Sequence, residues 1–122
     1  MAAIKDVLNK FKAAGVDLAA IVSIDGMQIE SYSRGNLDVD ALCAIATTGL
    51  RISEALGREM ERGNAKQTVL EYEGGAIVLE PLNDEAMMLV VSADPKSIGR
   101  IRYMSKKYHQ ELIDALDGNG TL

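Results

Sequence analysis

The sequence contains few side chains of the kind that perform covalent chemistry. It has one cysteine, Cys43, and one histidine, His109. Nothing near Cys43 in the sequence is expected to lower its pKa, so we expect a buried thiol with a packing role. His109 lies in the polar stretch SKKYHQE and is expected to be a solvated helix residue. Because one histidine and one cysteine cannot supply a nucleophile–base pair or a zinc site, the sequence predicts no catalytic residues, no metal and no cofactor.

Glycine pairs and carboxylate pairs also have structural explanations. Gly74-Gly75 indicates a hairpin turn, because no glycine is followed by Lys-Ser or Lys-Thr as in a phosphate-binding loop. Neighbouring carboxylates fall at predicted helix ends or turns, where capping and solvation account for them. These pairs are Asp38/Asp40, Glu59/Glu61 and Asp84/Glu85. We therefore expect a protein that is not an enzyme and has no small-molecule substrate.

Two groups of charged residues remain. The second half of a long predicted helix carries mixed charge, and Glu54 and Arg58 stand four residues apart within it. Such a pair contributes about 0.2–0.5 kcal/mol on an isolated helix. The start of the final helix is basic, which fits either a solvated face or a site for an anionic partner. Its basic residues are Lys96, Arg100, Arg102, Lys106 and Lys107.

The composition is that of one globular domain. With 122 residues, we expect a single domain over residues 1–117 and a short flexible tail over residues 118–122. No apolar run approaches the roughly 20 residues that span a bilayer, and the N-terminus lacks a signal-peptide core, so we expect no membrane insertion and a cytoplasmic location. The net charge of −5 and the scarcity of aromatic residues argue against nucleic acid as a partner.

Five segments have the patterns of β-strands. Three are apolar on both faces, as in the centre of a sheet, and two alternate between apolar and polar residues, as at its edges. The central segments are Leu18–Ile24, Ala76–Leu82 and Ala86–Ser92, and the edge segments are Met27–Ser33 and Lys66–Glu73.

Three helices complete the pattern. Met1–Ala14 is amphipathic, residues 38–63 form the longest helix, and Asp94-Pro95 opens a final helix that ends at Asp117–Gly120. The predicted order is α-β-β-α-β-β-β-α. It favours an α+β fold, a five-stranded antiparallel sheet with helices on both faces.

The long helix is unusually apolar. Asp38 is its expected N-cap, and Gly63-Asn64 its expected end. We expect one apolar stripe to face the sheet, yet the opposite side of the first half is also small and uncharged. The expected sheet-facing stripe is Leu42, Ile45, Gly49, Ile52, Leu56 and Met60, and the opposite side is Ala41, Ala44 and Thr48.

A symmetric dimer would bury this second apolar side. The edge strand Lys66–Glu73 follows directly after the long helix and carries little charge on one face, so it can pair with its copy across a two-fold axis. The predicted dimer interface consists of Ala41, Ala44, Thr48, Gly49, Gln67, Val69 and Glu71.

The order and spacing of these segments resemble the Roadblock/LC7 family, from about Ile4 to Leu116. The residues that carry the resemblance are GVDLAAIVSIDGMQIES, the small-residue helix after Asp40, EGGAIVLEPLNDEAMMLVV and IGRIRY. The resemblance implies a profilin-like fold and dimers formed through the third strand and second helix.

The resemblance also implies a function. The bacterial gliding-motility regulator of the family binds the switch regions of a small Ras-like GTPase and stimulates hydrolysis without an arginine finger. Other members, such as the dynein light chains, are structural adaptors in larger complexes. For this chain it implies a non-catalytic homodimeric regulator or scaffold for a GTPase, with the adaptor role as the alternative. The expected partner-binding residues are Arg51, Glu54, Arg58, Glu59 and Arg62.

Overall fold

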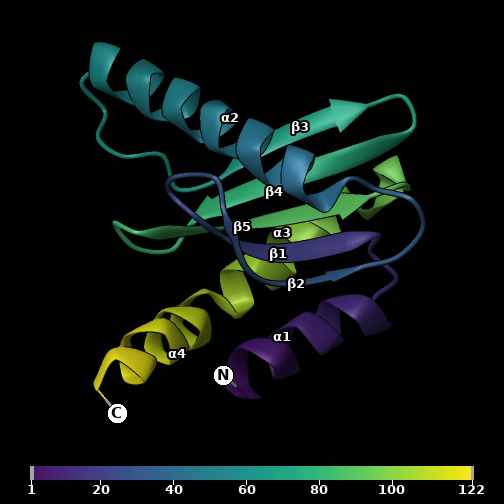
Figure 1. Cartoon of the computed structure of the whole chain (residues 1–122). Helices are drawn as coiled ribbons and strands as arrows, with labels where there is room; N and C mark the ends of the chain where they lie inside the picture. Colours follow the sequence, from purple (N-terminus) through teal and green to yellow (C-terminus); the bar gives the residue numbers. More distant parts are fainter. Residues whose placement is uncertain (1, 122) are drawn as a thin grey trace.

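The fold is a five-stranded antiparallel sheet between two layers of helices (Figure 1). The computed structural model describes residues 2–121, with side chains for residues 3–118. The strands run in the order β2-β1-β5-β4-β3, with α2 on one face and α1, α3 and α4 on the other. The elements are α1 (Ala2–Ala13), β1 (Leu18–Ser23), β2 (Gln28–Ser33), α2 (Val39–Glu59), β3 (Thr68–Tyr72), β4 (Gly75–Pro81), β5 (Ala86–Ser92), a short 3₁₀ helix (Pro95–Ser97), α3 (Ile98–Lys107) and α4 (His109–Thr121).

The strand pattern confirms the predicted fold class and the predicted positions of the strands. The three doubly apolar strands β1, β4 and β5 are central, and the alternating strands β2 and β3 are the two edges. Burial of both faces creates two cores. The larger core, under α1, α3 and α4, includes Phe11, Ile21, Met88, Ile101 and Leu112. The smaller core, under α2, includes Leu18, Val22, Cys43, Ala46, Leu79 and Leu89.

The face of α2 that packs on the sheet agrees with the prediction only in part: Leu42 packs against the smaller core and Gly49 lies beside Leu79, as expected. Asp38 caps the helix as expected, since its carboxylate accepts a hydrogen bond from the Ala41 N–H at 3.1 Å. The buried residues of α2, however, are small: Cys43, Ala46, Thr47 and Gly57. The expected sheet-facing residues Ile45, Ile52, Leu56 and Met60 are exposed. The prediction was wrong because the large side chains of β4 and β5 already fill the space, so that small residues on the helix pack closest.

Two glycines allow the backbone to approach α2 closely. A Cβ on Gly26, in the β1–β2 turn, would lie 3.3 Å from the Cα of Ala44. A Cβ on Gly57 would lie 2.4 Å from the carbonyl oxygen of Gly63, because the chain folds back against the helix as it leaves α2. The same return brings the Arg62 N–H to the Gly57 carbonyl at 2.9 Å.

The predicted final helix is two helices in the structure. The chain leaves α3 at Tyr108, and α4 begins at His109. Tyr108 makes an edge contact with Phe11 of α1, and Leu112 is fully buried in the larger core. The break therefore lets α4 turn onto the core beside α1. The helix α4 continues past the expected end at Asp117–Gly120 to Thr121. The flexible tail over residues 118–122 stays a prediction, and Met1 and Leu122 lie outside the described residues.

The contact at Gly57 predicts a difference between two helical glycines. Gly57→Ala should destabilise the fold by about 1–3 kcal/mol, because the new methyl group would overlap the Gly63 carbonyl. Gly99→Ala is the matched control: no atom lies within 4 Å of its Cβ position, so the change should stabilise the chain by up to about 1 kcal/mol. Urea unfolding of both variants measures the change in the free energy of unfolding. Equal changes in the two variants would contradict the close contact between Gly57 and the Gly63 carbonyl.

Candidate functional site

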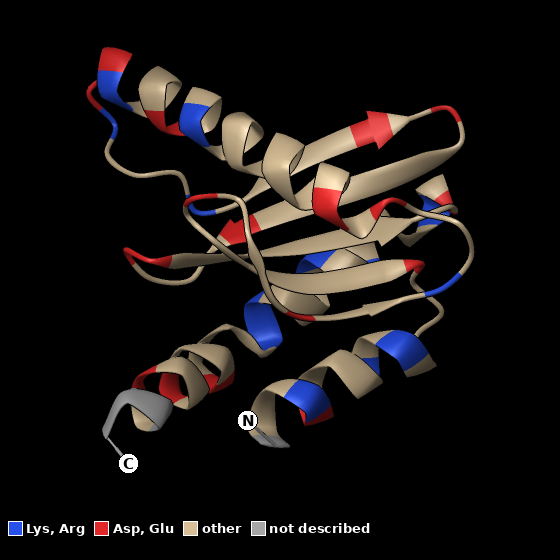
Figure 2. Ribbon diagram, in the orientation of Figure 1, with Lys and Arg blue, Asp and Glu red and all other residues tan. Residues whose placement is uncertain are grey.

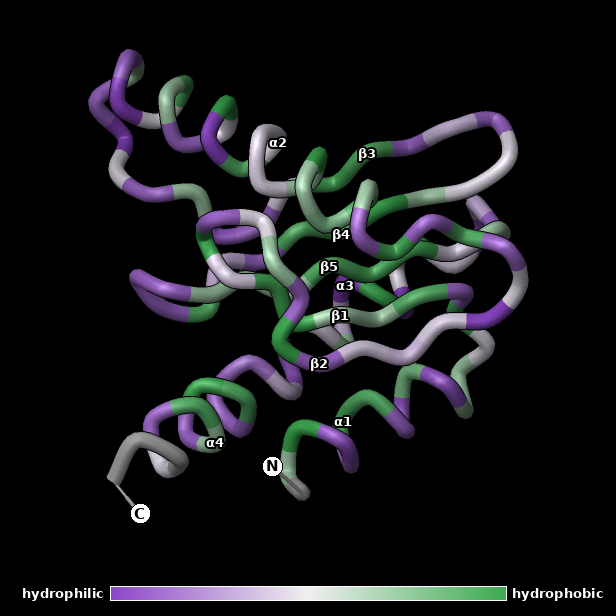
Figure 3. The backbone as a smooth tube through the Cα atoms, viewed as in Figure 1, coloured by the Kyte–Doolittle hydropathy of each residue, from purple (hydrophilic) through white to green (hydrophobic). Residues whose placement is uncertain are grey.

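The outer face of α2 is an exposed apolar stripe, which we call the α2 stripe and define as Ile45, Ile52, Leu56 and Met60. Their side chains are 58–66% exposed, although they are large and apolar. Their spacing of four and seven residues places them on one side of the helix. No charged residue occurs from Ala41 to Leu50, and Figure 2 shows this uncharged stretch in the first half of α2. Figure 3 shows hydrophobic residues along α2 as well as in the central strands.

The edge strand β3 adjoins the stripe and adds to its apolar surface. Thr68 donates a hydrogen bond to Ser53 of α2 at 2.8 Å, so this face of β3 points toward α2. Leu70 and Tyr72 follow on the same face and are exposed. Because β3 pairs only with β4, its other edge has no strand beside it in the described residues. Helix stripe and strand edge together form one surface of a kind that monomeric proteins rarely expose.

The predicted dimer residues lie around this surface in different settings. Ala44 and Thr48 are exposed and Ala41 is half-buried. Gly49 lies beside the sheet, since its Cβ position is 3.3 Å from Cδ1 of Leu79. Val69 packs against the core under α1, α3 and α4, on the opposite face of β3 from Thr68. Of the remaining two, Glu71 is exposed and Gln67 is part of a polar network.

That polar network joins the start of β3 to α3 and α4. Glu80 is 1% exposed, and its carboxylate accepts a hydrogen bond from the Gln67 amide at 2.8 Å and contacts Nδ1 of His109 at 2.6 Å. Gln67 also accepts a hydrogen bond from Nε of Arg102 at 2.8 Å. The expectation of a solvated His109 was therefore wrong. The sequence signal was Glu80 itself, a carboxylate within an apolar strand, which in a buried position requires partners.

Three of the five predicted partner-binding residues meet at one hollow. Arg51, Glu54 and Arg58 line a cavity of about 220 Å³ between α2 and the β1–β2 turn. The remaining lining residues are Ile24, Thr47 and Leu50. Arg51 donates a hydrogen bond to the Ile24 carbonyl at 3.3 Å. Glu59 and Arg62 are exposed and do not line the hollow.

The predicted ion pair between Glu54 and Arg58 is absent. Glu54 instead accepts a hydrogen bond from the Ala65 N–H at 3.1 Å, because the chain returns past α2 at this point. Among the described residues, the ion pair is Arg34–Asp17, and Glu80 contacts His109 in a pair that is ionic only when the imidazole is protonated. Arg58 is therefore not held by a carboxylate, and its guanidinium is available at the hollow.

The comparison with known families agrees with this arrangement of elements. The sequence model of the Roadblock/LC7 domain matches residues 4–92, from α1 through the last strand. The chain belongs to the Roadblock/LC7 domain family. Domains of this family are generally regulatory or adaptor domains rather than enzymes.

Among proteins similar in sequence to this Roadblock/LC7 domain is the uncharacterized protein MJ1340 of Methanocaldococcus jannaschii. It is 28% identical over 102 residues, which are 83% of this chain and 88% of that protein. Among solved structures, MglB of Myxococcus xanthus matches with a TM-score of 0.85 and 18% identity, over 96% of this chain and 90% of that one. MglB has also been solved in a tetrameric arrangement.

A more distant structural neighbour extends the description of the fold. Profilin II of Acanthamoeba castellanii matches with a TM-score of 0.60 and 13% identity, over 86% of this chain and 90% of that one. The Roadblock/LC7 domain is thus profilin-like in architecture, as the sequence predicted. At these identities the structural likeness describes the fold alone.

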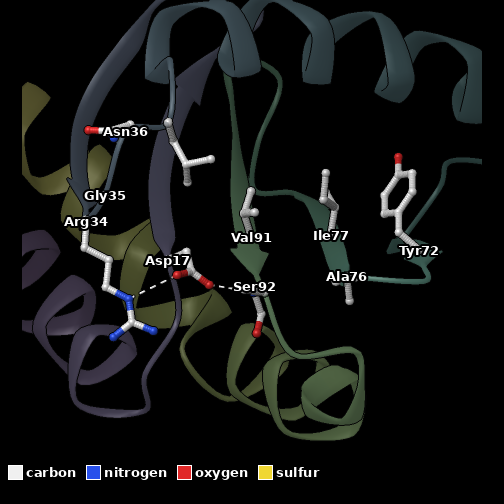
Figure 4. A pocket seen from close by; sticks show the side chains of 13 residues that line it. Asp17, Arg34, Gly35, Asn36, Tyr72, Ala76, Ile77, Val91 and Ser92 are labelled. Carbon is white, nitrogen blue, oxygen red and sulfur yellow. Dashed lines mark hydrogen bonds and ion pairs between the residues drawn. The ribbon is translucent and has the colours of Figure 1, made fainter.

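A further pocket of the Roadblock/LC7 domain lies at one end of the sheet (Figure 4). Its cavity, of about 460 Å³, is lined on the α2 side by apolar groups, among them Tyr72 and Ile77. The charged groups of its wall are engaged in structural contacts. Asp17 bonds to Arg34 Nε at 3.1 Å and accepts from the Ala93 N–H, which ties β1, β2 and β5 together. Because Asp17 and Arg34 are held in these contacts, the pocket presents no nucleophile–base pair among the described residues.

Cys43, the single cysteine of the sequence, is fully buried in the core under α2. Burial raises the pKa of the Cys43 thiol, and the Asp40 carboxylate adds to this effect. A protonated thiol is a poor nucleophile, so the predicted packing role is confirmed. The described residues contain no group of three or more His, Cys, Asp or Glu side chains that could hold a metal ion. No helix among them is long and apolar enough to cross a membrane.

The setting of Cys43 predicts slow thiol chemistry. Near pH 8, Ellman's reagent should label the native chain about 100-fold more slowly than the chain in denaturant, because a buried thiol reacts only through local opening. Absorbance of the released thionitrobenzoate measures both rates. Rapid labelling of the folded chain would mean that Cys43 is accessible and that α2 does not pack as described.

Proposed function

We propose that this chain is a non-catalytic homodimer that binds a small Ras-like GTPase and regulates it. The observation that carries the proposal is the exposure of the apolar α2 stripe together with the free edge of β3. A surface of this kind is costly to leave in water, and homodimer interfaces are more apolar than the rest of a protein surface.

A two-fold axis beside β3 would satisfy both parts of this surface. The strand would pair with its own copy and extend the sheet across two subunits, and the two α2 helices would lie side by side. The exposed Thr48 and Ala44 beside the stripe are small enough to let the helices approach closely. The tetrameric arrangement of the similar MglB supports self-association through this fold.

The dimer can be tested with a pair of exposed isoleucines. Ile52→Glu places a charge in the α2 stripe and should convert the dimer to a monomer, because an unpaired charge cannot be buried cheaply. Ile29→Glu makes the same change at β2, the opposite edge of the sheet, and should leave the dimer intact. Analytical ultracentrifugation at micromolar concentration distinguishes the two. A monomeric wild-type chain, or equal loss with both variants, would disprove the interface.

The GTPase would bind at the hollow lined by Arg51, Glu54 and Arg58. These side chains lie on the flank of α2 rather than on its outer stripe, so they stay exposed when the stripe is covered. The hollow offers two guanidinium groups beside the half-exposed Ile24, a mixture suited to a protein partner. The family resemblance supplies the identity of that partner, and the absence of a catalytic set in the described residues leaves reshaping of the GTPase as the means of regulation.

Binding should prefer the GTP-bound state, since a regulator shifts an equilibrium only through different affinities for its two states. Arg51→Glu combined with Arg58→Glu should weaken binding by about tenfold, through loss of two charge-assisted contacts. The free energy of unfolding should change by about 0.5 kcal/mol or less, as is usual at surface positions. Titration calorimetry against a candidate small Ras-like GTPase, loaded with each nucleotide, gives these affinities.

The matched control is Lys106→Glu combined with Lys107→Glu, which reverses the same amount of charge on α3. It should leave GTPase binding nearly unchanged. Loss of binding only in this control would move the site to α3. Equal affinity for the GTP and GDP states would indicate the alternative function, a structural adaptor that does not affect hydrolysis.

A further inference from the structure

The charge of this acidic protein is unevenly distributed, with a basic region on α3. Residues 95–110 contain five of the 13 basic residues and none of the 18 acidic ones. All five are exposed, and none of them has a carboxylate partner in the described part of the chain. We call this exposed face the α3 basic face: Lys96, Arg100, Arg102, Lys106 and Lys107.

Helix stability does not account for this arrangement. Basic residues are favourable near the C-terminus of a helix, which explains Lys106 and Lys107. Lys96 and Arg100 lie at the opposite end, where the helix dipole favours negative charge, and no acidic residue occupies the first turn of α3. Lys96 and Arg100 therefore do not stabilise the helix through its dipole.

Arg102 is held in position by groups of its own subunit. Its Nε donates to the Gln67 side chain at 2.8 Å, and Gln67 donates in turn to the buried Glu80 carboxylate at 2.8 Å. The two terminal guanidinium nitrogens have no partner among the described residues, so their N–H groups can donate to the carboxylate of a ligand. A guanidinium fixed by one nitrogen loses less side-chain freedom when it binds an anion in bidentate fashion.

A hollow lies beside this arginine. It has a cavity of about 280 Å³ lined by Gln67, Gly99, Arg102, Tyr103 and Lys106. Gly99 is a helical residue, where glycine is unfavourable, and no atom lies within 4 Å of its Cβ position. Packing within the domain therefore does not require glycine here. A larger residue would fill the hollow, and the exposed Tyr103 ring forms one of its walls.

We propose that the α3 basic face binds an acidic peptide segment of a partner protein, with carboxylates on Arg102 and Lys106 and the peptide chain over Gly99. The surroundings favour a short segment over a broad anionic surface. The neighbouring helix α4 exposes Glu111, Asp114 and Asp117, which would repel a membrane or a nucleic acid laid across both helices (Figure 2). Tyr103 is the one large apolar side chain of α3 that is exposed, so α3 offers little surface for insertion into a lipid layer.

The site lies on the face of the sheet opposite α2, away from the α2 stripe and the hollow at Arg51, and it shares only Gln67 with the predicted dimer interface. A dimer paired through α2 and β3 would carry two such basic faces. Each would be free to hold an acidic segment while the α2 side is occupied.

The test uses the full-length chain and a fluorescein-labelled peptide of alternating glutamate and serine, with a glutamine–serine peptide as the neutral reference. Fluorescence anisotropy at low ionic strength should show binding of the glutamate peptide only. Arg102→Glu combined with Lys106→Glu should weaken it by about tenfold or more. Lys5→Glu combined with Lys12→Glu, which reverses equal charge on α1, should leave the affinity within about twofold. Gly99→Gln adds no charge but fills the hollow, and it should also weaken binding while the chain stays folded by circular dichroism.

Each other outcome would overturn the proposal. If the α3 and α1 variants lost equal affinity for the glutamate peptide, binding would depend only on the overall charge of the protein and not on the α3 basic face. An unchanged affinity of Gly99→Gln would remove the hollow from the site. Tighter binding of phosphatidylserine vesicles or of duplex DNA than of the peptide would identify a different class of partner. No binding of the glutamate peptide would leave the basic face a solvated surface. Because the Arg51 and Arg58 variant keeps the α3 face intact, it should bind the peptide normally even if it has lost a GTPase.

Discussion

The close packing of α2 against the sheet is the constraint on which the rest of this structure depends. The sheet presents large side chains to the helix, including Leu79, Met87 and Leu89. The residues of α2 that are buried against the sheet are small, among them Cys43, Ala46 and Gly57. Small residues on the inner face bring the two backbones near each other, and Gly26 extends that approach to the β1–β2 turn. Val39, Leu42 and Leu50 pack at the margin of this contact, whereas Ile45, Ile52, Leu56 and Met60 are left exposed on the outer face.

This constraint also explains which parts of the fold the sequence could predict. Strand positions and their places in the sheet follow from period-two patterns and doubly apolar runs, which depend on local burial and were correct. The face of α2 was wrong because both sides of the helix are apolar, so that periodicity identifies two stripes without ranking them. The larger residues were assigned to the core, yet the available space depends on β4 and β5, which lie more than fifteen residues further along the chain.

The polar network around Glu80 was missed for a related reason. Its four members come from the lead-in to β3, from β4, from α3 and from α4, and nothing local relates Gln67 to Arg102 or Glu80 to His109. The sequence shows only that Glu80 interrupts an apolar strand. The break after α3 is equally invisible, because no proline or glycine marks Tyr108. It results from tertiary contacts, the edge contact of Tyr108 with Phe11 and the burial of Leu112.

The polar network gives the edge strand a fixed starting point. Gln67 precedes β3 directly and is bonded to Glu80 and Arg102, so the strand that would pair with a second copy begins from a residue tied to the opposite layer of helices. On the other side of the sheet, Thr68 is bonded to Ser53 of α2. Consecutive residues thus connect β3 to both layers, and the free edge is held in one register although no strand lies beside it in a single subunit. A strand whose two faces are fixed in this way cannot pair with its copy in an alignment shifted by one residue, because such a slip would exchange its two faces. The hydrogen bonds of Gln67 and Thr68 would thereby fix which face of β3 lies beside the α2 stripe when a second copy approaches the free edge.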